Sequence, residues 1–236
     1  MENPSLTRTR LLNVPVDAVD EVQALQEVER LLADKQQHQI LFLTLRGLMR
    51  GRRDPEFRRC LREAALILPV YPGLVRAARF LHRGTLSLYS PFSFVIRLLS
   101  LAERLNGTVY LLGARKEDLE RAERNLKGSF PKLRLVGRFA GYYPKAAEKD
   151  VLVAIKKATP SILLVADGRP GRELWIVRRK RELTPGIALW VGDCFEIFSG
   201  RRRSSQLPAE GAAGVFSLLR VLLFWLMVLA TKVFRR

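Results

Sequence analysis

The sequence predicts an α/β fold with a doubly wound, largely parallel, Rossmann-like sheet, followed by a C-terminal helical appendage that associates with membranes. Short apolar runs alternate with segments of helical periodicity between residues 18 and 191, which is the pattern of a parallel sheet crossed by helices. The run SILLVA at 161–166 is apolar throughout, as in a strand covered on both faces. Ligands of such sheets bind beyond the carboxyl ends of the strands, so we expect a site at that edge.

The chain is long enough for one domain and an appendage. Its 236 residues, 48% of them apolar, can bury one full-sized core and hardly two. We therefore assign residues 1–205 to the α/β domain and residues 206–236 to a linker and a membrane-associating helix. Residues 1–17 contain basic side chains but no apolar run long enough for a signal peptide, so we expect the domain in the cytosol.

The predicted helices carry apolar side chains at every third or fourth position. They lie at 18–34, 54–65, 94–106, 117–127, 145–158 and 173–181. Asp54 is the expected N-cap of the second of these helices, and Pro55 is its expected first residue. The predicted strands are short apolar runs that end in polar or turn residues. They lie at 39–44, 66–69, 108–113, 133–136, 161–166 and 187–191.

Glycine follows the later predicted strands, at Gly113, Gly137, Gly168 and Gly192. Glycine lets the backbone approach a ligand closely, and the backbone N–H groups at the starts of the following helices favour phosphate. The set therefore favours a nucleotide-like ligand. The alternative is that these glycines only form tight turns.

The net charge of +18 and the isoelectric point near 10.8 call for an anionic partner. Arginine-rich stretches occur at 50–53, 178–181 and 201–203, and together they could bind nucleic acid through phosphate contacts alone. However, the interleaved aromatic residues of a single-strand platform are missing, and so are helix-turn-helix, RNA-recognition and zinc-finger patterns. Acidic lipid and phosphorylated small molecules explain the charge with fewer assumptions, so nucleic acid is disfavoured.

Two cysteines and two histidines limit the chemistry that these residues can support. Cys60 and Cys194 are too few for a disulfide framework and have no Cys or His neighbour at metal-ligand spacing, so we expect two buried thiols. His38 and His82 have no Ser-His-Asp or Cys-His pattern around them. A histidine-based nucleophilic mechanism is therefore disfavoured.

The C-terminal tail is the most apolar part of the chain. Residues 212–234 admit only Arg220 and Lys232 as charges, a length that could cross about 30 Å of bilayer. Arg220 would cost roughly 2.5–3.5 kcal/mol near the centre of a span. Three interpretations stay open: a transmembrane anchor, a helix lying in the membrane interface, and a helix buried against the domain or a partner subunit.

Aromatic and basic side chains favour the interfacial interpretation of the tail. Such residues suit an anionic leaflet, where each basic side chain contributes about 1 kcal/mol. Both flanks of the tail are basic, so the positive-inside rule gives no clear orientation for a span. The residues concerned are Phe216, Phe224, Trp225, Phe234, Arg201, Arg202, Arg203, Lys232, Arg235 and Arg236.

Five segments carry a family resemblance: DPEFRRCLREAALILP (54–69), GLVRAARFL (73–81), the stretch from VYLLG to AGYY (109–143), SILLVADGRPGRELWIVRRKREL (161–183) and ALWVGDCFEIFSGRRR (188–203). In wording and order they resemble the WecG/TagA/CpsF family of bacterial glycosyltransferases, over about residues 11–205. That family transfers N-acetylmannosamine or a related sugar from a UDP donor to a polyprenyl-diphosphate-linked sugar at the inner membrane face. A membrane-seeking C-terminal appendage is also a trait of the family.

The resemblance implies a base that activates the acceptor hydroxyl and a site that stabilises the leaving UDP. Thr44 matches the threonine that follows the first long strand of the family, and Arg46 replaces its asparagine. The Pro-Asp-Gly segment of the family reads Pro-Val-Tyr at 69–71, so Val70 stands where the presumed base would be. The second acid of the family, in a Thr-Gly-x-Asp segment, meets Ser-Pro-Phe-Ser at 90–93.

The end of the fold that binds the donor in the family is better preserved. Arg172 replaces a glutamine there, and Glu196 conservatively replaces an acid. The resemblance implies donor binding by Gly113, Gly137, Tyr142, Gly168, Glu173 and Gly192. The carboxylates that could substitute for the missing base are Asp167, Asp193 and Glu196.

Together these features predict an enzyme that transfers an N-acetylhexosamine, of the N-acetylmannosamine kind, from a UDP-sugar to a polyprenyl-diphosphate-linked acceptor in cell-surface polysaccharide assembly. Thr44 would orient a substrate, and Arg201, Arg202 and Arg203 would attract the lipid diphosphate. No metal or other cofactor is expected, because the sequence has no Asp-x-Asp pattern. We expect the protein on the cytoplasmic face of the bacterial inner membrane, peripheral or monotopic. Its oligomeric state, including a homo-oligomer, is left open, and a catalytically inactive member that binds lipid-linked intermediates or a partner enzyme is the alternative.

Overall fold

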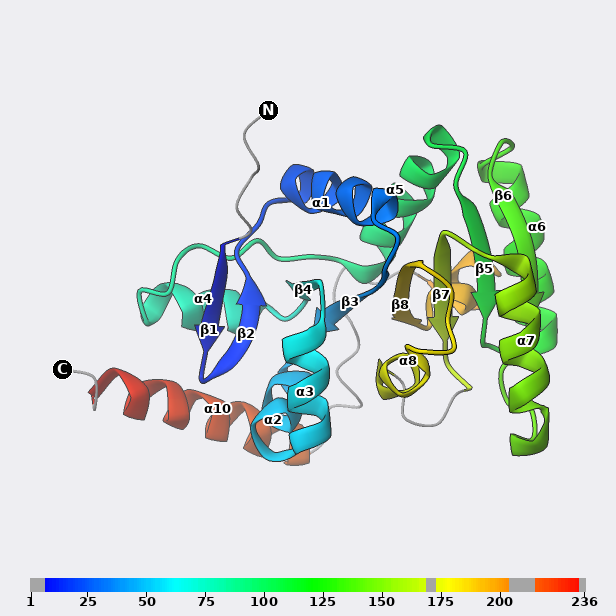
Figure 1. Cartoon of the computed structure of the whole chain (residues 1–236). Coiled ribbons are helices and arrows are strands. Elements are labelled where there is room, and N and C mark those ends of the chain that lie inside the picture. The colour runs from blue at the N-terminus through cyan, green and yellow to red at the C-terminus, as the bar shows by residue number, and fades with distance from the viewer. Residues whose placement is uncertain (1–6, 169–172, 204–214, 234–236) are drawn as a thin grey trace. The chain divides into compact units, whose positions relative to one another are not determined.

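The structure is a computed structural model of the chain and describes residues 7–168, 173–203 and 215–233 (Figure 1). The described residues form two compact units. Unit 1 is drawn from the ranges 1–24, 41–90 and 205–236, and unit 2 from 25–40 and 91–204. The C-terminal helix, which the sequence assigned to a separate appendage, is part of unit 1.

A six-stranded sheet has the strand order β4-β3-β8-β7-β5-β6, and the neighbour pairings from β3 to β6 are all parallel. The prediction of an α/β fold with a largely parallel sheet is confirmed. The strands are β3 (Gln37–Leu43), β4 (Leu66–Pro69), β5 (Thr108–Leu112), β6 (Arg134–Phe139), β7 (Ile162–Ala166) and β8 (Gly186–Gly192).

Unit 2 is built around β7, which is buried at every position, as its unbroken apolar run predicts. Strands β5 and β8 pair with it on either side. The side chains of Val165, Ile155 and Trp175 meet in one apolar cluster of this core. The helical elements of this part of the chain are α1 (Glu21–Ala33), α5 (Pro91–Arg104), α6 (Lys116–Ser129), a 3-10 turn (Lys145–Ala147), α7 (Glu148–Ala158), α8 (Glu173–Arg179) and α9 (Cys194–Phe198).

Unit 1 contains a β-hairpin and two short helices, α2 and α4, that were not predicted from the sequence. The hairpin is β1 (Arg8–Leu11) and β2 (Val14–Asp17), and the helices of the unit are α2 (Leu45–Arg53), α3 (Pro55–Glu63), α4 (Pro72–Phe80) and α10 (Val215–Val233). In unit 2 the short helix α9 was not predicted either. With nine residues or fewer, each of these helices is too short to show a clear apolar period.

A buried carboxylate fixes the hairpin to β4. Asp17 accepts two hydrogen bonds from Arg8, at 2.7 and 2.9 Å, and a third from the backbone of Ile67 at 2.7 Å. Arg8 also donates to the carbonyls of Ala64 and Ala65, each at 3.0 Å. Because the side chain of Asp17 is fully buried, these bonds compensate the loss of its hydration.

The α2–α3 corner is shaped by capping side chains and one glycine. Asp54 caps α3 as predicted, and its carboxylate accepts from the backbone of Phe57, a bond that lowers the pKa of Asp54 together with the Arg50 guanidinium 2.9 Å away. Gly51 of α2 is buried, and a side chain there would come within 2.4 Å of Leu61. Its lack of a side chain lets the two helices pack closely.

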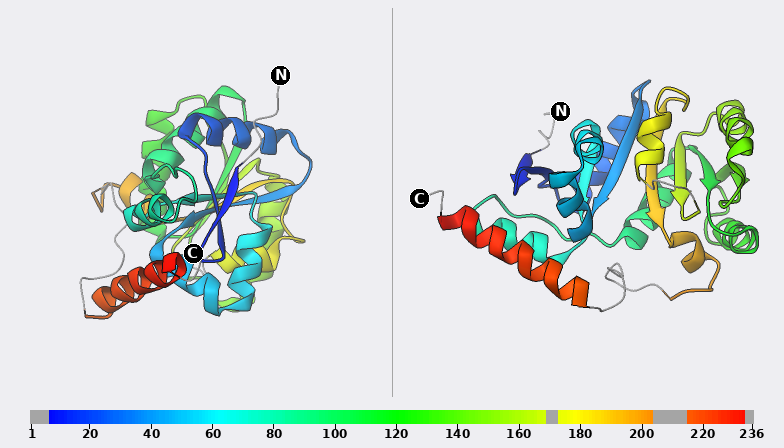
Figure 2. Two further views of the ribbon diagram at one scale, coloured as in Figure 1. Left: turned by 90° about the vertical axis from the view of Figure 1, so that its left-hand side faces the viewer. Right: turned by 90° about the horizontal axis from the view of Figure 1, so that it is seen from below.

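Helix α10 presents one apolar ridge to unit 1 and another to the outside. Phe224 and Val228 are fully buried, whereas Leu222 and Leu226 are 58% and 54% exposed. The last turn lies against the end of α4 (Figure 2). There the Lys232 ammonium is 3.8 Å from the centre of the Phe80 ring. Among the described residues, no helix combines the length and the apolar content needed to cross a membrane.

Candidate functional site

The candidate site of unit 2 lies at the carboxyl ends of β5, β7 and β8, where backbone hydrogen bonds connect the loops that follow the strands. Ala114 donates to the carbonyl of Asp167 at 2.6 Å, and the Asp167 N–H donates to the carbonyl of Gly192 at 3.2 Å. Gly141 donates to Ala114, and Tyr142 donates to Gly168, at 2.8 and 3.1 Å. The loops therefore form one continuous edge, which is the position at which parallel sheets bind ligands.

Two of the predicted glycines are required by contacts between these loops. Gly113 and Gly168 have φ values of +122° and +106°, which residues with side chains rarely adopt. A side chain on Gly113 would come within 2.7 Å of the Ala166 carbonyl, and one on Gly168 within 2.9 Å of Gly141. These two glycines serve the packing of the edge, whatever ligand it binds.

Gly137 is packed against a neighbouring ring, whereas Gly192 has open space around it among the described residues. The predicted end of a strand at residue 136 is wrong, because β6 continues to Phe139 and Gly137 lies inside it. A side chain on Gly137 would strike the Tyr110 ring at 2.4 Å, so this glycine makes room for an aromatic ring rather than for a ligand. Gly192 has φ +58°, and the nearest described atom to a side chain there would be the Trp190 indole nitrogen at 3.9 Å. The described residues therefore leave open space at the end of β8.

Two candidate carboxylates are paired with arginines of the segment that follows them. The Asp193 carboxylate is 2.7 Å from the Arg202 guanidinium, and the Glu196 carboxylate is 2.5 Å from that of Arg201. The backbone of Arg202 also donates to the Glu196 carbonyl at 3.1 Å. The structure thus brings the predicted acids and two of the predicted arginines together, while Arg203 is exposed.

Asp118 completes this cluster, and it was not predicted from the sequence. Its buried carboxylate lies in the first turn of α6, 3.1 Å from Arg201 and 3.4 Å from the Ser199 hydroxyl. The Asn125 side chain, further along the same helix, donates to the Phe198 carbonyl at 2.7 Å. Helix α6 therefore holds α9 and the arginine segment in place. An acidic residue in a first helical turn was the only signal in the sequence, and that signal is common.

Tyr142 offers an exposed aromatic ring at the same edge of loops. Its side chain is 64% exposed, and its backbone is held by the bond to Gly168. Asp167 is half-buried within the same edge. Glu173 begins α8, and its carbonyl accepts from the buried Gln39 amide at 3.0 Å. Arg172, which replaces a glutamine of the family, lies outside the described residues.

The predicted residues of unit 1 have a different environment. The Thr44 hydroxyl caps α2 by accepting a hydrogen bond from the backbone of Gly47 at 2.9 Å. Val70, which directly follows β4, is fully buried, and its backbone donates to the Leu43 carbonyl at 3.1 Å. The residue that replaces the presumed base of the family is therefore part of an apolar core.

Thiol chemistry and metal binding in the described residues depend on the two cysteines and on where the His, Cys, Asp and Glu side chains lie. Cys60 and Cys194 are both buried and form no disulfide, as predicted, and burial raises the pKa of the Cys194 thiol well above its ordinary value. A raised pKa keeps this thiol protonated and unreactive. Within the described residues, no cluster of His, Cys, Asp and Glu is placed to hold a metal ion.

In chemical terms, the edge combines loop backbone, an exposed aromatic ring, carboxylates and guanidinium groups. Guanidinium groups suit a diphosphate, which they bind through paired hydrogen bonds, and an exposed ring can stack on a planar base. A half-buried carboxylate can accept a proton from a hydroxyl placed within hydrogen-bond distance. The arrangement can therefore bind a nucleotide diphosphate next to a candidate base.

Comparison with known proteins agrees with this geometry. Two relatives, from Bacillus spizizenii (strain ATCC 23059 / NRRL B-14472 / W23) and Bacillus subtilis (strain 168), are 26% and 25% identical over 147 and 150 residues, which are 62% and 63% of this chain. The chain spans little more than half of each of them, 56% and 57%. A Staphylococcus aureus (strain NCTC 8325 / PS 47) protein is 20% identical over 204 residues, 86% of this chain and 80% of the relative.

All three relatives bear the name N-acetylglucosaminyldiphosphoundecaprenol N-acetyl-beta-D-mannosaminyltransferase. The sequence model described as "Glycosyl transferase WecG/TagA/CpsF family" matches residues 9–208, which include the strand-end edge of unit 2 and the elements of unit 1 from β2 to α4. The resemblance seen in the sequence is thereby confirmed, and this chain belongs to the WecG/TagA/CpsF family of glycosyl transferases.

Proposed function

We propose that this protein transfers an N-acetylhexosamine, of the N-acetylmannosamine kind, from a UDP-sugar to a polyprenyl-diphosphate-linked acceptor in cell-surface polysaccharide assembly. The observation that carries the proposal is the family match over residues 9–208, together with relatives named for the transfer of N-acetylmannosamine to N-acetylglucosaminyl-diphosphoundecaprenol. The donor, the acceptor and the activity of this chain are inferred from that match.

The donor side of the proposal rests on the edge of unit 2. The uracil ring would stack on Tyr142, whose ring is exposed and whose backbone is fixed. The diphosphate would approach the open space at Gly192 and draw Arg202 away from Asp193. Because the leaving diphosphate gains negative charge as the sugar bond breaks, arginines placed there favour the transition state.

The base is the least determined part of the proposal. Asp167, Asp193 and Glu196 are the carboxylates near the strand ends, and Asp193 and Glu196 are each paired with an arginine. A diphosphate that competes for Arg202 would free the Asp193 carboxylate to accept the proton of the acceptor hydroxyl. This coupling makes Asp193 the first carboxylate to test.

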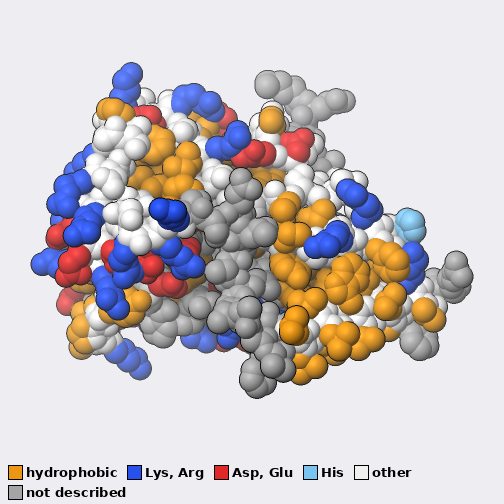
Figure 3. Space-filling model, turned by 180° about the vertical axis from the view of Figure 1, so that it is seen from behind, with side chains coloured by type: hydrophobic (Ala, Val, Ile, Leu, Met, Phe, Trp, Pro, Cys, Tyr) orange, Lys and Arg blue, Asp and Glu red, His pale blue; other side chains and the backbone are white. Residues whose placement is uncertain are grey.

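The acceptor side of the proposal places the protein on an anionic membrane surface at the cytoplasmic face of the bacterial inner membrane, as a peripheral or monotopic protein. Exposed apolar side chains on α10 follow one another at spacings of three and four residues, which puts them on one helix face. Figure 3 shows apolar side chains gathered on the face that it draws. The exposed row consists of Leu218, Leu222, Leu226, Leu229 and Val233.

Transfer of radiolabelled N-acetylmannosamine from UDP to an N-acetylglucosaminyl-diphospho-polyprenol in detergent or vesicles tests the enzyme proposal, with calorimetric titration of UDP alongside it. We expect both UDP binding and transfer. UDP binding without transfer to this acceptor or its chain-length analogues would instead favour a catalytically inactive member, the role compatible with Val70 in the position of the base.

Three single variants test the carboxylates. Asp193→Asn, Asp167→Asn and Glu196→Gln each keep the size of the side chain and remove its ability to take a proton. We expect at least one of them to lower kcat by about a hundredfold or more while UDP binding persists. Glu120→Gln, on α6, is the matched control. Full activity in all three variants would remove these residues as bases.

A further inference from the structure

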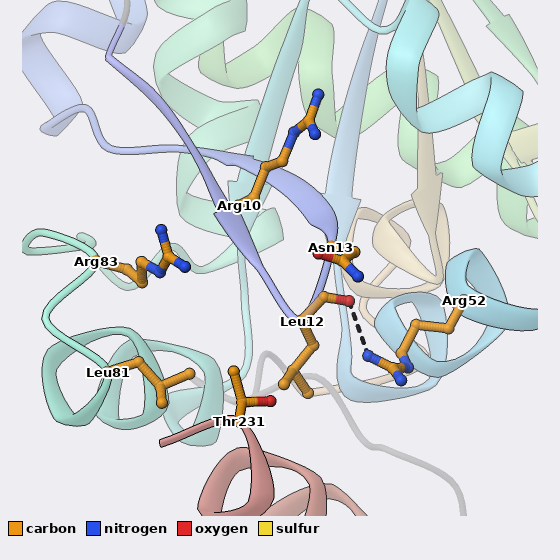
Figure 4. A pocket seen from close by; sticks show the side chains of 7 residues that line it. All are labelled: Arg10, Leu12, Asn13, Arg52, Leu81, Arg83 and Thr231. Carbon is orange, nitrogen blue, oxygen red and sulfur yellow. Dashed lines mark hydrogen bonds between the residues drawn. The ribbon is translucent and has the colours of Figure 1, made fainter. Parts of the chain in front are cut away.

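A second arginine cluster, which shares no residue with the strand-end edge of unit 2, lines a cavity of about 270 Å³ in unit 1. Its walls come from the tip of the β1–β2 hairpin, the end of α2, the segment after α4 and the last turns of α10. Figure 4 shows Arg83 and Arg52 on opposite sides of the hairpin turn, Arg10 projecting from β1, and Thr231 beneath the turn. The remaining lining residues are Leu12, Asn13 and Leu81.

The charged side chains that line this cavity are all positive. None of its seven lining residues is acidic, and none of the ion pairs found among the described residues involves Arg10, Arg52 or Arg83. Arg52 is positioned by a 2.9 Å hydrogen bond from one of its nitrogens to the Leu12 carbonyl, which leaves its other N–H groups available. Arg58 adds a further positive charge in the adjoining cavity, which shares Leu12, Asn13 and Arg52.

Several arginines without an ion pair in the described part of the chain, gathered around one cavity, need a reason, because like charges repel one another when no anion lies between them. Other arginines of unit 1 form ion pairs, Arg8 with Asp17, Arg50 with Asp54 and Arg59 with Glu63. Exposed arginines such as Arg76 form none among the described residues, so the distinguishing feature of the cavity is that three arginines without such a pair line it together. A phosphate group would satisfy the guanidinium groups of the cavity through paired hydrogen bonds. Asn13 could donate a further neutral hydrogen bond, whereas the Thr231 hydroxyl already donates to the Met227 carbonyl at 2.8 Å.

The position of the cavity on α10 indicates where such a phosphate would come from. Thr231 is two residues from both Leu229 and Val233, so it lies on the face of α10 opposite the exposed apolar row, the face that carries the buried Val228. A helix that lies in a membrane interface places its apolar side chains among the acyl chains and its flanks at the depth of the headgroups. Thr231 lines the cavity from the face opposite the apolar row, which in such a helix is turned toward the headgroups.

We propose that the Arg10–Arg52–Arg83 cavity binds the headgroup phosphate of an anionic phospholipid and so fixes unit 1 on the membrane at one orientation. The proposal rests on the membrane association proposed above, and adds to it a defined lipid site made mostly by residues outside the C-terminal helix. The occupant is argued from the complementary charge and from the place of the cavity on the face of α10 opposite the apolar row. A free phosphate or diphosphate shares the same chemistry and is separated from the lipid by the experiment.

The test is flotation of the full-length protein with vesicles of phosphatidylcholine alone and with vesicles of phosphatidylcholine and phosphatidylglycerol in equal amounts. Arg10→Gln with Arg83→Gln removes two charges from the cavity, and Arg121→Gln with Arg124→Gln removes two charges from α6 of unit 2. Neither Arg10 nor Arg83 forms an ion pair among the described residues, so we expect normal circular dichroism and thermal unfolding for both double variants.

We expect the wild-type protein to float with the anionic vesicles and the cavity variant to bind them at least tenfold more weakly, since each arginine at such a surface contributes about fivefold. The α6 variant should change by less than about twofold. If both double variants lose affinity equally, net charge alone is responsible and the cavity proposal is wrong. If the wild type floats with neither kind of vesicle, the membrane association itself fails.

Inorganic phosphate and pyrophosphate separate the lipid from a soluble anion. Calorimetric titration of the wild type in the absence of vesicles should give no saturation by either anion below millimolar concentration. Saturable micromolar binding that the cavity variant loses would overturn the lipid assignment in favour of a soluble phosphate ligand. UDP titration of the cavity variant should match the wild type, because the cavity shares no residue with the strand-end edge of unit 2.

Discussion

The carboxyl ends of the strands differ between the two units. In unit 2 they carry carboxylates, arginines and an exposed tyrosine, connected by hydrogen bonds and ion pairs. In unit 1 the corresponding ends of β3 and β4 carry a capping threonine and a fully buried valine, and a group of arginines lines the cavity instead. The strand ends of unit 2 therefore carry groups that can transfer a proton or bind a phosphate. Unit 1 has no carboxylate or arginine directly at the described ends of β3 and β4, and three of its arginines line a cavity that could bind an anion.

An acid at position 70 would give the end of β4 a carboxylate like those of unit 2, and we expect it to have the largest effect of the changes considered. Val70→Asp puts a carboxylate into a fully buried position, and we expect it to lower the free energy of unfolding by roughly 3–5 kcal/mol at neutral pH. Burial raises the pKa of such an acid in the folded protein, so the loss should grow as pH rises above the unfolded pKa and shrink at low pH, where the acid is protonated in both states.

Chemical denaturation of Val70→Asp at several pH values measures this effect, and Val70→Asn, which has the same shape without the charge, is its control. An Asp variant as stable as the Asn variant at neutral pH would mean that the position is hydrated. If the Asp variant also transferred sugar faster than the wild type, unit 1 would still contain a working acceptor site.

Charged substitutions in the exposed row of α10 test whether this part of unit 1 binds membranes. Leu222→Glu with Leu226→Glu should weaken binding to anionic vesicles by roughly a hundredfold or more, because each leucine loses about 1.5 kcal/mol or more of apolar burial and gains repulsion. Thermal unfolding should change little, since both side chains are more than half exposed.

Vesicle flotation measures the effect of the α10 substitutions. Leu105→Glu with Val153→Glu, at positions 40% and 50% exposed in unit 2, is the matched control and should float like the wild type. Equal losses in both double variants would show that any exposed apolar side chain contributes, and that α10 has no special part in the binding.

Asp118→Asn tests the support that α6 gives to the active edge of unit 2. Loss of the carboxylate leaves Arg201 with Glu196 as its remaining acid, and we expect a cost of about 1–2 kcal/mol because Arg201 is partly exposed and water can solvate it. UDP affinity should fall with it, because the arginine segment loses an anchor. Calorimetry measures that affinity, and Glu120→Gln on the same helix should leave it unchanged.

Asp54→Ala gives the smallest effect and concerns unit 1 alone. Loss of the cap of α3 should lower the free energy of unfolding by about 1 kcal/mol, and Asp54→Asn should restore most of it, because asparagine also caps helices. The pKa of Asp54 is lowered from its ordinary value of 3.8, so the stability that its charge contributes is present above that pH and is lost as pH falls below it.

Chemical denaturation of the wild type and of the Asp54→Ala variant, at neutral pH and in acid, measures this contribution. The difference in unfolding free energy between the two proteins should shrink as the carboxylate is protonated. A difference that stays the same from neutral pH into strong acid would contradict the assignment of the cap to the charged form of Asp54.

The alternating core of the fold could be predicted because its signals are local. The apolar run of β7 and the Asp-Pro start of α3 each specify their element within a few residues. Helix α2 was missed because two glycines lower its helical tendency, and only its packing against α3 compensates. The hairpin was missed because its turn places Leu12 at φ +50°, a conformation for which leucine gives no signal.

The candidate site was predictable to the extent that the residues lie near one another in the sequence. Asp193, Glu196 and the arginines that pair with them lie within ten positions, so a sequence pattern can associate them. Asp118 pairs with Arg201 across the fold, and no spacing rule connects the two. Gly137 illustrates the opposite error, since a glycine that follows an apolar run can equally accommodate a neighbouring ring inside the strand.

Unit 1 combines residues before position 91 with residues after position 204, so its parts are synthesised at different times. Phe224 and Val228 of α10 are fully buried in a unit whose other described residues all precede position 91, so that part of unit 1 is synthesised before α10 is. Unit 2 has all of its residues available by position 204 and can fold first. Until α10 has been synthesised, the part of unit 1 that Phe224 and Val228 pack against lacks its cover.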